Sequence, residues 1–238
     1  MSLPVWAVVP ASGVGRRMGA DLPKQYLRVG GRSLLEHSLF QLLDHPRVEG
    51  AVLALAPQDD RWQRLGFQHQ KPLLLSTGGV ERLHSVHAAL LRLHGHLGTD
   101  ALVLVHDAVR PFLLEEDLDR LIDQALEDDN GALLATPVAD TLKRSDSTGK
   151  APPRVLDTVP RDGLWQALTP QAFRLYLLIK ALELAISDDA PLTDDASAME
   201  LAGYSPRLVR GDRRNIKITH PEDLLLAEWI VRSFSSDG

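Results

Sequence analysis

A glycine-rich segment followed by cations is the first candidate for chemistry. Gly13 and Gly15 come after a short apolar run, and Arg17 and Lys24 follow them. Glycines let backbone N–H groups approach a phosphate closely, and the cations would attract a polyphosphate. A tight strand-to-helix turn with solvated arginines explains the glycines alone equally well. A dinucleotide fingerprint is disfavoured, because Met18 stands where its third glycine would be.

The sequence His106-Asp107-Ala108-Val109-Arg110-Pro111 directly follows another apolar run. If that run is a central strand, its carboxyl end places Asp107 where open α/β sheets bind ligands. Carboxylate oxygens suit Mg²⁺, which usually takes one or two carboxylates together with substrate phosphates. Asp107 is therefore a candidate ligand of Mg²⁺ or of a ribose. The alternative is a turn or helix-cap residue that pairs with Arg110.

Further polar clusters occur later in the chain, at the expected boundaries of helices and strands. Arg161 and Lys217 are candidate anchors for a second anion. The adjacent Asp194 and Asp195 could bind a metal, but acids that stabilise a helix N-terminus explain them equally well. The nine histidines show no spacing typical of a metal-binding set, so we expect packing or surface roles for them.

Composition restricts the class of protein. The chain has 238 residues, a formal net charge of −6 and no cysteine. A negative chain is unlike nucleic-acid binders that neutralise phosphates broadly, and without cysteine it forms neither disulfides nor thiolate metal sites. No apolar run reaches the roughly 20 residues that span a bilayer, and the N-terminus does not resemble a signal peptide. We therefore expect a cytoplasmic protein with neither nucleic-acid nor membrane partners.

Alternating apolar runs and amphipathic stretches predict the elements that position these residues. A single α/β domain over residues 1–238 is expected, with a doubly wound, mostly parallel, Rossmann-like sheet. Ser33 with Glu36, and Thr219 with Glu222, match the capping box of a helix start. The predicted strands are 5–9, 51–55, 73–75, 101–105 and 132–135, and the predicted helices include 34–43, 82–93 and 118–126.

A polar, turn-rich stretch at 143–153 interrupts this alternation. We interpret it as the tip of a projecting β-arm over residues 137–159. The flanking runs 136–142 and 155–159 are candidates for its two paired strands. Two such strands alone are marginally stable, which suggests that a partner subunit covers them.

Eight strings in this order resemble the 2-C-methyl-D-erythritol 4-phosphate cytidylyltransferases of the non-mevalonate isoprenoid pathway. The resemblance covers nearly the whole chain. The strings are PASGVGRRM from Pro10, PKQYL from Pro23, LLEHS from Leu34, TGGVERLHSV from Thr77, HDAVRP from His106, TVPRDGLWQALTPQ from Thr158, TDDAS from Thr193, and NIKIT with HPEDL from Asn215.

The resemblance implies transfer of the cytidylyl group of CTP to 2-C-methyl-D-erythritol 4-phosphate, a small phosphorylated polyol, with release of pyrophosphate. It also implies Mg²⁺ as cofactor, with Asp107 beside metal and ribose, and a homodimer whose arms embrace, so that Thr141 and Arg161 would serve the partner's site. Arg17 and Lys24 match residues that stabilise the transition state, and Arg161 and Lys217 match residues that orient the second phosphate. The implied CTP cradle is Ala11, Ser12, Gly13, Gly15, Gly78, Gly79 and Ser85, and the implied acceptor pocket includes Arg110, Thr141 and Thr193.

Several alternatives stay open at the level of sequence. A ribitol-5-phosphate cytidylyltransferase would have the same nucleotide half and differ in the acceptor pocket. A sugar-nucleotide pyrophosphorylase that uses another base is more distant. Among other classes, a dinucleotide-dependent oxidoreductase is disfavoured by the missing glycine, and a non-catalytic nucleotide sensor by the retained cations.

Overall fold

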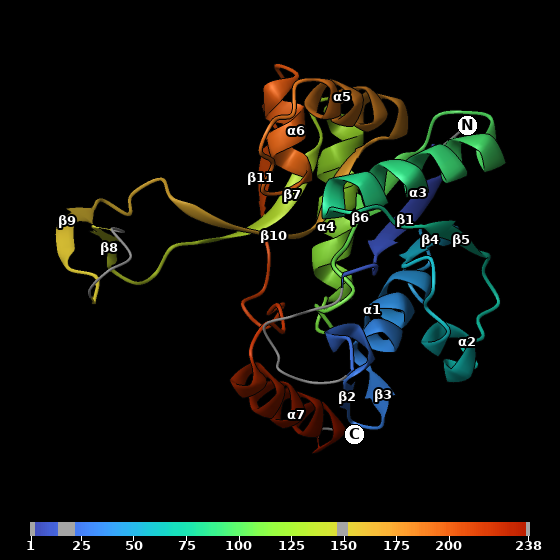
Figure 1. Ribbon diagram of the computed structural model, residues 1–238, viewed down its shortest axis with the longest axis horizontal. Helices are drawn as coiled ribbons and strands as arrows, with labels where there is room; N and C mark the ends of the chain where they lie inside the picture. Colours follow the sequence, from blue (N-terminus) through green and yellow to red (C-terminus); the bar gives the residue numbers. More distant parts are fainter. Residues whose placement is uncertain (1–2, 14–21, 147–151, 237–238) are drawn as a thin grey trace.

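A seven-stranded sheet forms the centre of the protein (Figure 1). The computed structural model describes residues 3–13, 22–146 and 152–236. The strand order is β11-β7-β10-β6-β1-β4-β5, in which β10 pairs antiparallel with β6 and β7 and the other pairings are parallel. The predicted mostly parallel α/β sheet is confirmed. The strands are β1 (Val5–Pro10), β4 (Gly50–Leu55), β5 (Leu73–Thr77), β6 (Leu102–Val105), β7 (Ala132–Pro137), β10 (Trp165–Arg174) and β11 (Arg207–Arg210).

Helices cover both faces of this sheet. Ala7 and Val9 of β1 pack in one apolar cluster with α1 (Leu34–Leu43) and α4 (Glu115–Glu127). Trp6 and Val8 point the other way, into a cluster with α3 (Arg82–Leu97), α5 (Leu175–Ser187) and α6 (Asp195–Leu201). Successive side chains on a strand face opposite sides, so a strand buried on both faces needs an unbroken apolar run. These apolar runs are the reason that the central strands could be predicted from the sequence.

The smaller elements lie around this core. They are the short helices η2 (Lys24–Tyr26) and α2 (Arg61–Leu65), the hairpin of β2 (Arg28–Val29) and β3 (Arg32–Ser33), and the C-terminal helix α7 (Pro221–Ser236). Within the described ranges, each helix is too short or too polar to cross a membrane.

The two predicted helix caps have different outcomes. At α1 the capping box is present: Ser33 Oγ accepts from Glu36 N at 3.2 Å, and Glu36 Oε2 accepts from Ser33 N at 2.7 Å. At α7 the prediction of Thr219 with Glu222 is wrong. The helix begins at Pro221, and the Asp223 carboxylate accepts from the N–H groups of Thr219 and His220. Proline is favourable at the first position of a helix, so this helix starts one residue later than predicted. The acidic residue that caps it is therefore also one residue later.

The arm projects from the sheet, far from the helices (Figure 1). Its two strands are β8 (Leu142–Ser145) and β9 (Val155–Val159), so the expected first strand at 136–142 is wrong in its bounds. Residues 136–137 still belong to β7, and β8 reaches into the stretch expected as the tip. Strand pairing there is supported by polar contacts rather than apolar alternation: Lys143 Nζ donates to Thr158 Oγ1 at 2.6 Å, and Arg144 pairs with Asp157 at 3.2 Å.

Candidate active site

A cavity of about 240 Å³ opens at the carboxyl ends of β1 and β6. It contains five residues expected at the nucleotide site, together with a cation expected at the second anion site. The lining is Pro10, Ala11, Ser12, Gly13, Lys24, Gln25, Val80, Glu81, Arg82, Asp107, Ala108, Val109 and Lys217. Residues from five separate stretches of sequence thus meet at one sheet edge, as open α/β sheets require of their ligand sites.

Local contacts hold the first loop and Lys24 together. The loop leaves β1 with Ala11 N donating to Ala54 O at 2.8 Å. Gln25 is buried and donates from Nε2 to Ala11 O at 2.7 Å, which ties η2 to that loop. Lys24 precedes Gln25, so this bond places the Lys24 side chain on the cavity wall. Gly15 and Arg17 lie outside the described residues, and their roles stay predictions.

Gly78 and Ser85 contact Ser12 of this loop, and the exposed Gly79 contacts Ser85; none of the three is among the residues that line the cavity. Ser85 Oγ donates to Glu81 O at 3.1 Å and accepts from Gly79 N at 3.0 Å. Because Ser85 already donates its single hydroxyl proton to Glu81 O, the Ser12 hydroxyl is the donor in the 2.7 Å hydrogen bond between the two serines. A buried Ser85 therefore fixes the rotamer of Ser12, which does line the cavity.

Replacing Gly78 with alanine is expected to weaken binding of CTP, the nucleotide that the resemblance implies, about tenfold, because the added Cβ would lie 2.4 Å from Ser12 Cβ and push the loop inward. Calorimetric titration with CTP measures this. Gly95→Ala is the matched control, since a Cβ there meets nothing within 4 Å. Equal CTP affinities in the two variants would show that the packing of Gly78 against Ser12 is unimportant.

Asp107 lies at the centre of a cluster of charges. Its carboxylate is 2.9 Å from Lys217 Nζ, 3.3 Å from Arg82 Nε and 3.4 Å from Arg110 Nε. Burial opposes ionisation of this carboxyl, but the charges of Arg82, Lys217 and Arg110 hold its pKa far below the usual range. Asp107 is therefore a carboxylate throughout the physiological pH range. The predicted pairing with Arg110 is present, and Asp107 also lines the cavity; its role as a ligand of Mg²⁺ or of a ribose stays a prediction.

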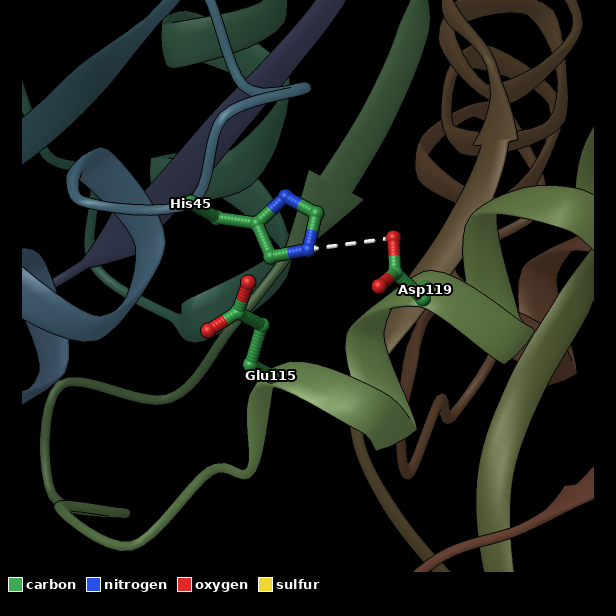
Figure 2. Close-up of side chains that lie close together, drawn as sticks. All are labelled: His45, Glu115 and Asp119. Atoms are coloured by element: carbon green, nitrogen blue, oxygen red, sulfur yellow. Dashed lines mark ion pairs between the residues drawn. The ribbon is translucent and has the colours of Figure 1, made fainter.

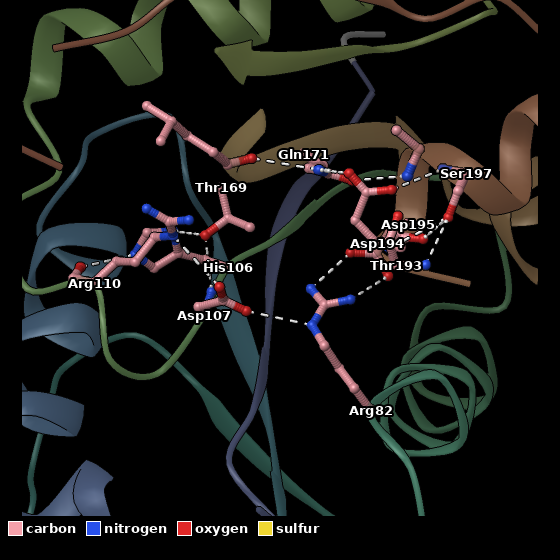
Figure 3. Close-up of polar contacts among 12 residues, drawn as sticks. Arg82, His106, Asp107, Arg110, Thr169, Gln171, Thr193, Asp194, Asp195 and Ser197 are labelled. Carbon is pink, nitrogen blue, oxygen red and sulfur yellow. Dashed lines mark hydrogen bonds and ion pairs between the residues drawn. The ribbon is translucent and has the colours of Figure 1, made fainter. Parts of the chain in front are cut away.

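Arg82 is a site residue that sequence reasoning missed. It is the first residue of α3, and its two Nη atoms contact the Asp195 carboxylate at 3.0 and 2.8 Å (Figure 3). Burial disfavours its charge, yet Asp195 and Asp107 together raise its pKa above the usual value. A cation in the first turn of a helix is disfavoured by the helix dipole, and the ion pairs with Asp195 and Asp107 offset this cost at Arg82. That electrostatic conflict was the signal in the sequence.

A second cavity, of about 210 Å³, adjoins the first. Both expected acceptor residues in the body of the protein, Arg110 and Thr193, line it. The full lining is Arg82, Asp107, Arg110, Ala167, Leu168, Thr169, Gln171, Thr193, Asp194 and Lys217. Since Arg82, Asp107 and Lys217 line both cavities, they form a shared wall, and we use that term for these three residues below.

The acidic pair beside the second cavity is structural. Asp194 caps α6 by accepting from Ser197 N at 2.9 Å, and it also accepts from Gln171 Nε2 at 2.8 Å (Figure 3). Asp195 is 1% exposed and holds Arg82. Both acids therefore lie at a helix N-terminus, as one of the two interpretations predicted, with Asp194 as the cap and Asp195 as the first residue of α6.

Thr141 and Arg161 are not among the described residues that line the two cavities. Both are exposed, and both lie at the base of the arm. The Arg161 guanidinium donates to Ala139 O. Their expected role in the site of a second copy stays a prediction.

One histidine lies in a cluster that the sequence did not suggest. His45, Glu115 and Asp119 place ligand atoms within 4.8 Å of one another (Figure 2). However, His45 Nδ1 accepts from Arg47 N at 3.3 Å, so the proton of the neutral ring lies on Nε2, the nitrogen that faces Asp119. A protonated nitrogen has no lone pair for a metal. Burial lowers the pKa of His45, so we interpret its 3.3 Å approach to Asp119 as a polar contact of a neutral ring, without hydrogen-bond geometry.

Comparison with known proteins points to one family. Residues 5–233 match the family model for 2-C-methyl-D-erythritol 4-phosphate cytidylyltransferase. A protein of that name from Pseudomonas fluorescens is 50% identical over 232 residues, which cover 97% of this chain and 96% of the relative. 

Solved structures agree as well. One of a 4-diphosphocytidyl-2C-methyl-D-erythritol synthase has a TM-score of 0.82 at 36% identity and covers 97% of this chain and 100% of its own. The Francisella tularensis 2-C-methyl-D-erythritol 4-phosphate cytidylyltransferase has a TM-score of 0.79 at 32% identity, with coverages of 94% and 98%. The family expected from the sequence is confirmed: the chain belongs to the 2-C-methyl-D-erythritol 4-phosphate cytidylyltransferases.

Proposed function

We propose that this chain transfers the cytidylyl group of CTP to 2-C-methyl-D-erythritol 4-phosphate. The observation that carries the proposal, beside family membership, is the shared wall, because two anionic substrates in adjoining cavities would meet at its cations. A phosphate oxygen of the acceptor forms a bond to the α-phosphorus of CTP, and the bond from that phosphorus to the bridging oxygen breaks. Pyrophosphate leaves with the electron pair, and the product is 4-diphosphocytidyl-2-C-methyl-D-erythritol.

The main obstacle to this reaction is electrostatic. The acceptor phosphate is already ionised near neutral pH, so no strong general base is needed, but one anion must approach another. Cations fixed before the reaction stabilise charge that builds on the transferring and leaving groups. Lys24 on the first cavity, with Arg17, would act on the triphosphate, and Lys217 on the shared wall would act on both substrates.

Asp107 is the residue we propose as the Mg²⁺ ligand. The donor set fits a hard cation, because an ionised carboxylate lines the cavity where phosphate oxygens would complete the coordination. When bound, Mg²⁺ would neutralise phosphate charge. Asp107 would then share its oxygens between the metal and the cations that now surround it. CTP and the acceptor are charged metabolites, and we propose that the reaction takes place in the cytoplasm.

Pyrophosphate release tests the function directly. The protein incubated with CTP and Mg²⁺ should release pyrophosphate on addition of 2-C-methyl-D-erythritol 4-phosphate, and should not do so with ribitol 5-phosphate. Matched reactions with ATP, GTP and UTP check the base. Release with ribitol 5-phosphate alone would contradict the acceptor, and release with neither acceptor would favour a nucleotide sensor.

We further propose that the chain works as a homodimer in which Thr141 and Arg161 complete the partner's acceptor pocket. The support is their position: both are exposed at the base of a projecting arm and line neither cavity of their own chain, and Val155 and Leu156 of the same arm are 64% and 63% exposed. Exposed apolar residues on a two-stranded ribbon favour coverage by another surface.

Subunit mixing tests this arrangement. Arg161→Ala and Lys24→Ala homodimers should each be nearly inactive. A re-equilibrated equal mixture should recover about a quarter of wild-type activity, because half of the dimers then carry one site with both residues intact. If Arg161 acted within its own chain, every site in the mixture would lack one residue and activity would not return. Arg144→Ala, also on the arm but paired with Asp157, is the control and should stay active without mixing.

A further inference from the structure

A closed ring of buried hydrogen bonds lies at the second cavity, and two of its four members, Arg110 and Thr169, line that cavity. Thr169 Oγ1 bonds His106 Nδ1 at 3.1 Å, and His106 Nε2 bonds Arg110 O at 3.1 Å. Arg110 Nη1 then donates to Asn215 O at 2.7 Å, and Asn215 Nδ2 donates to Thr169 O at 2.8 Å, which closes the ring. The four residues are 0%, 8%, 1% and 5% exposed for His106, Arg110, Asn215 and Thr169 respectively. Figure 3 shows the part formed by His106, Thr169 and Arg110.

The direction of each bond in the ring follows from its neighbours. A carbonyl oxygen only accepts, so His106 Nε2 carries the proton that reaches Arg110 O. The neutral ring has one such proton, and Nδ1 therefore accepts from the Thr169 hydroxyl. Thr169 Oγ1 retains lone pairs, and it accepts from the backbone N–H of Asp107 at 3.0 Å. His106 thus orients the hydroxyl that holds the Asp107 backbone.

The ring joins the segments that supply the charged residues of the shared wall. Asp107 follows His106 directly, and Lys217 lies two residues after Asn215. A separate bond, from Ile218 N to Val109 O at 3.0 Å, joins the same two segments. The Lys217 side chain is 42% exposed, so burial alone does not place it 2.9 Å from Asp107. Its position depends on its backbone, which the ring anchors.

We propose that His106 and Asn215 are positioning residues for cytidylyl transfer, acting by holding Asp107 and Lys217 in register at the shared wall. This inference rests on the function proposed above. Neither residue lines either cavity, so neither is offered as a contact to substrate. A misplacement of about 1 Å at a reacting centre can cost about 100-fold in rate, and a loosened ring would produce such an error.

Two single substitutions of His106 each remove one of its two hydrogen bonds. His106→Asn retains an acceptor near the Nδ1 position and loses the donor to Arg110 O. His106→Gln retains a donor near the Nε2 position and loses the acceptor for Thr169. Both variants, and Asn215→Ala, should lower kcat about tenfold to 100-fold with less than about threefold change in KM for CTP.

A variant that lowers Tm by a similar amount but leaves the ring intact serves as the control. Leu93→Ala, in a fully buried position of α3 outside both cavities, should lower Tm by a comparable amount and leave kcat unchanged below the transition. If the ring variants lowered Tm as Leu93→Ala does and retained wild-type kcat, the ring would be a folding element only, and the proposal would be overturned.

A spectroscopic readout on the wild-type protein does not depend on how the variants fold. The ¹⁵N resonances of His106 should show a proton on Nε2 and none on Nδ1. The opposite tautomer would overturn the ring, even in an active enzyme. An inactive wild type with the expected tautomer would instead count against the proposed function, so the two failures can be told apart.

Discussion

Lys24→Ala is expected to lower kcat by about 100-fold to 1,000-fold, with little change in KM for CTP. The lysine lies on the wall of the nucleotide cavity, on the short helix η2 that Gln25 ties to the first loop. A cation fixed there acts most strongly when negative charge moves onto the leaving pyrophosphate. Its loss should therefore affect the transition state more than the bound substrate. Steady-state pyrophosphate release at varied CTP concentration measures both constants.

A surface lysine provides the control for this substitution. Lys180 on α5 is 56% exposed and pairs with Glu183, so Lys180→Ala should leave both constants unchanged. Lys24→Arg should recover part of the lost kcat, because it restores the charge but with a different geometry. A rise in KM for CTP with kcat retained would mean that Lys24 contributes to binding only, and its assignment as a transition-state stabiliser would be wrong.

Asp107→Asn is expected to have the second large effect, on stability and on activity together. Removal of the carboxylate charge leaves Arg82, Arg110 and Lys217 close together without their central partner. Breaking a buried ion pair costs about 3 kcal/mol or more; we expect a value near this lower end, because Lys217 and Arg82 are partly solvated. We also expect at least a 100-fold loss of turnover, since the proposed Mg²⁺ ligand is lost. Chemical denaturation and pyrophosphate release measure the two effects.

Asp119→Asn is the matched control for stability. Asp119 also pairs with an arginine, Arg47 at 3.5 Å, but its side chain is 48% exposed. An exposed pair contributes about 1 kcal/mol or less, so this variant should be nearly as stable as the wild type and fully active. Comparable destabilisation in the two variants would show that the charge cluster at Asp107 is not a special contributor to stability.

Prediction of the fold from the sequence succeeded where burial imposes a pattern. The central strands are buried on both faces and so read as unbroken apolar runs, as at 5–9 and 51–55. Prediction failed where other forces decide. The long strand β10 contains Thr169, Pro170 and Gln171, which resemble a turn in sequence, and the arm strand β8 is held by polar pairs that produce no apolar alternation. In β10 the ladder with β7 is interrupted between Ala167 and Gln171, so pairing on either side carries the strand past Thr169 and Pro170; in β8 pairing with β9 overrides local preference.

Prediction of the site succeeded where the chemistry of a ligand restricts residue type, and it failed where contacts join distant parts of the chain. Cations near a glycine-rich loop, and an acid after an apolar run, indicated Lys24 and Asp107 because the chemistry of a polyphosphate restricts residue type. Arg82 was missed, since its two carboxylate partners lie 25 and 113 residues away in the chain. Gly78 and Ser85 were expected in the CTP cradle; the fold shows that they contact Ser12, and their contact with the nucleotide stays a prediction.

The glycine-rich loop, the charged strand end and the alternation of strands and helices were therefore determined by the sequence itself, because each reflects a local requirement for backbone freedom, charge or burial. The tertiary structure decided what no local pattern contains. It brought Arg82 and Lys217 to either side of Asp107, and it closed a hydrogen-bond ring through His106 and Asn215. Ion pairs and buried hydrogen bonds depend on distances between atoms, and those distances exist only after distant segments have packed together.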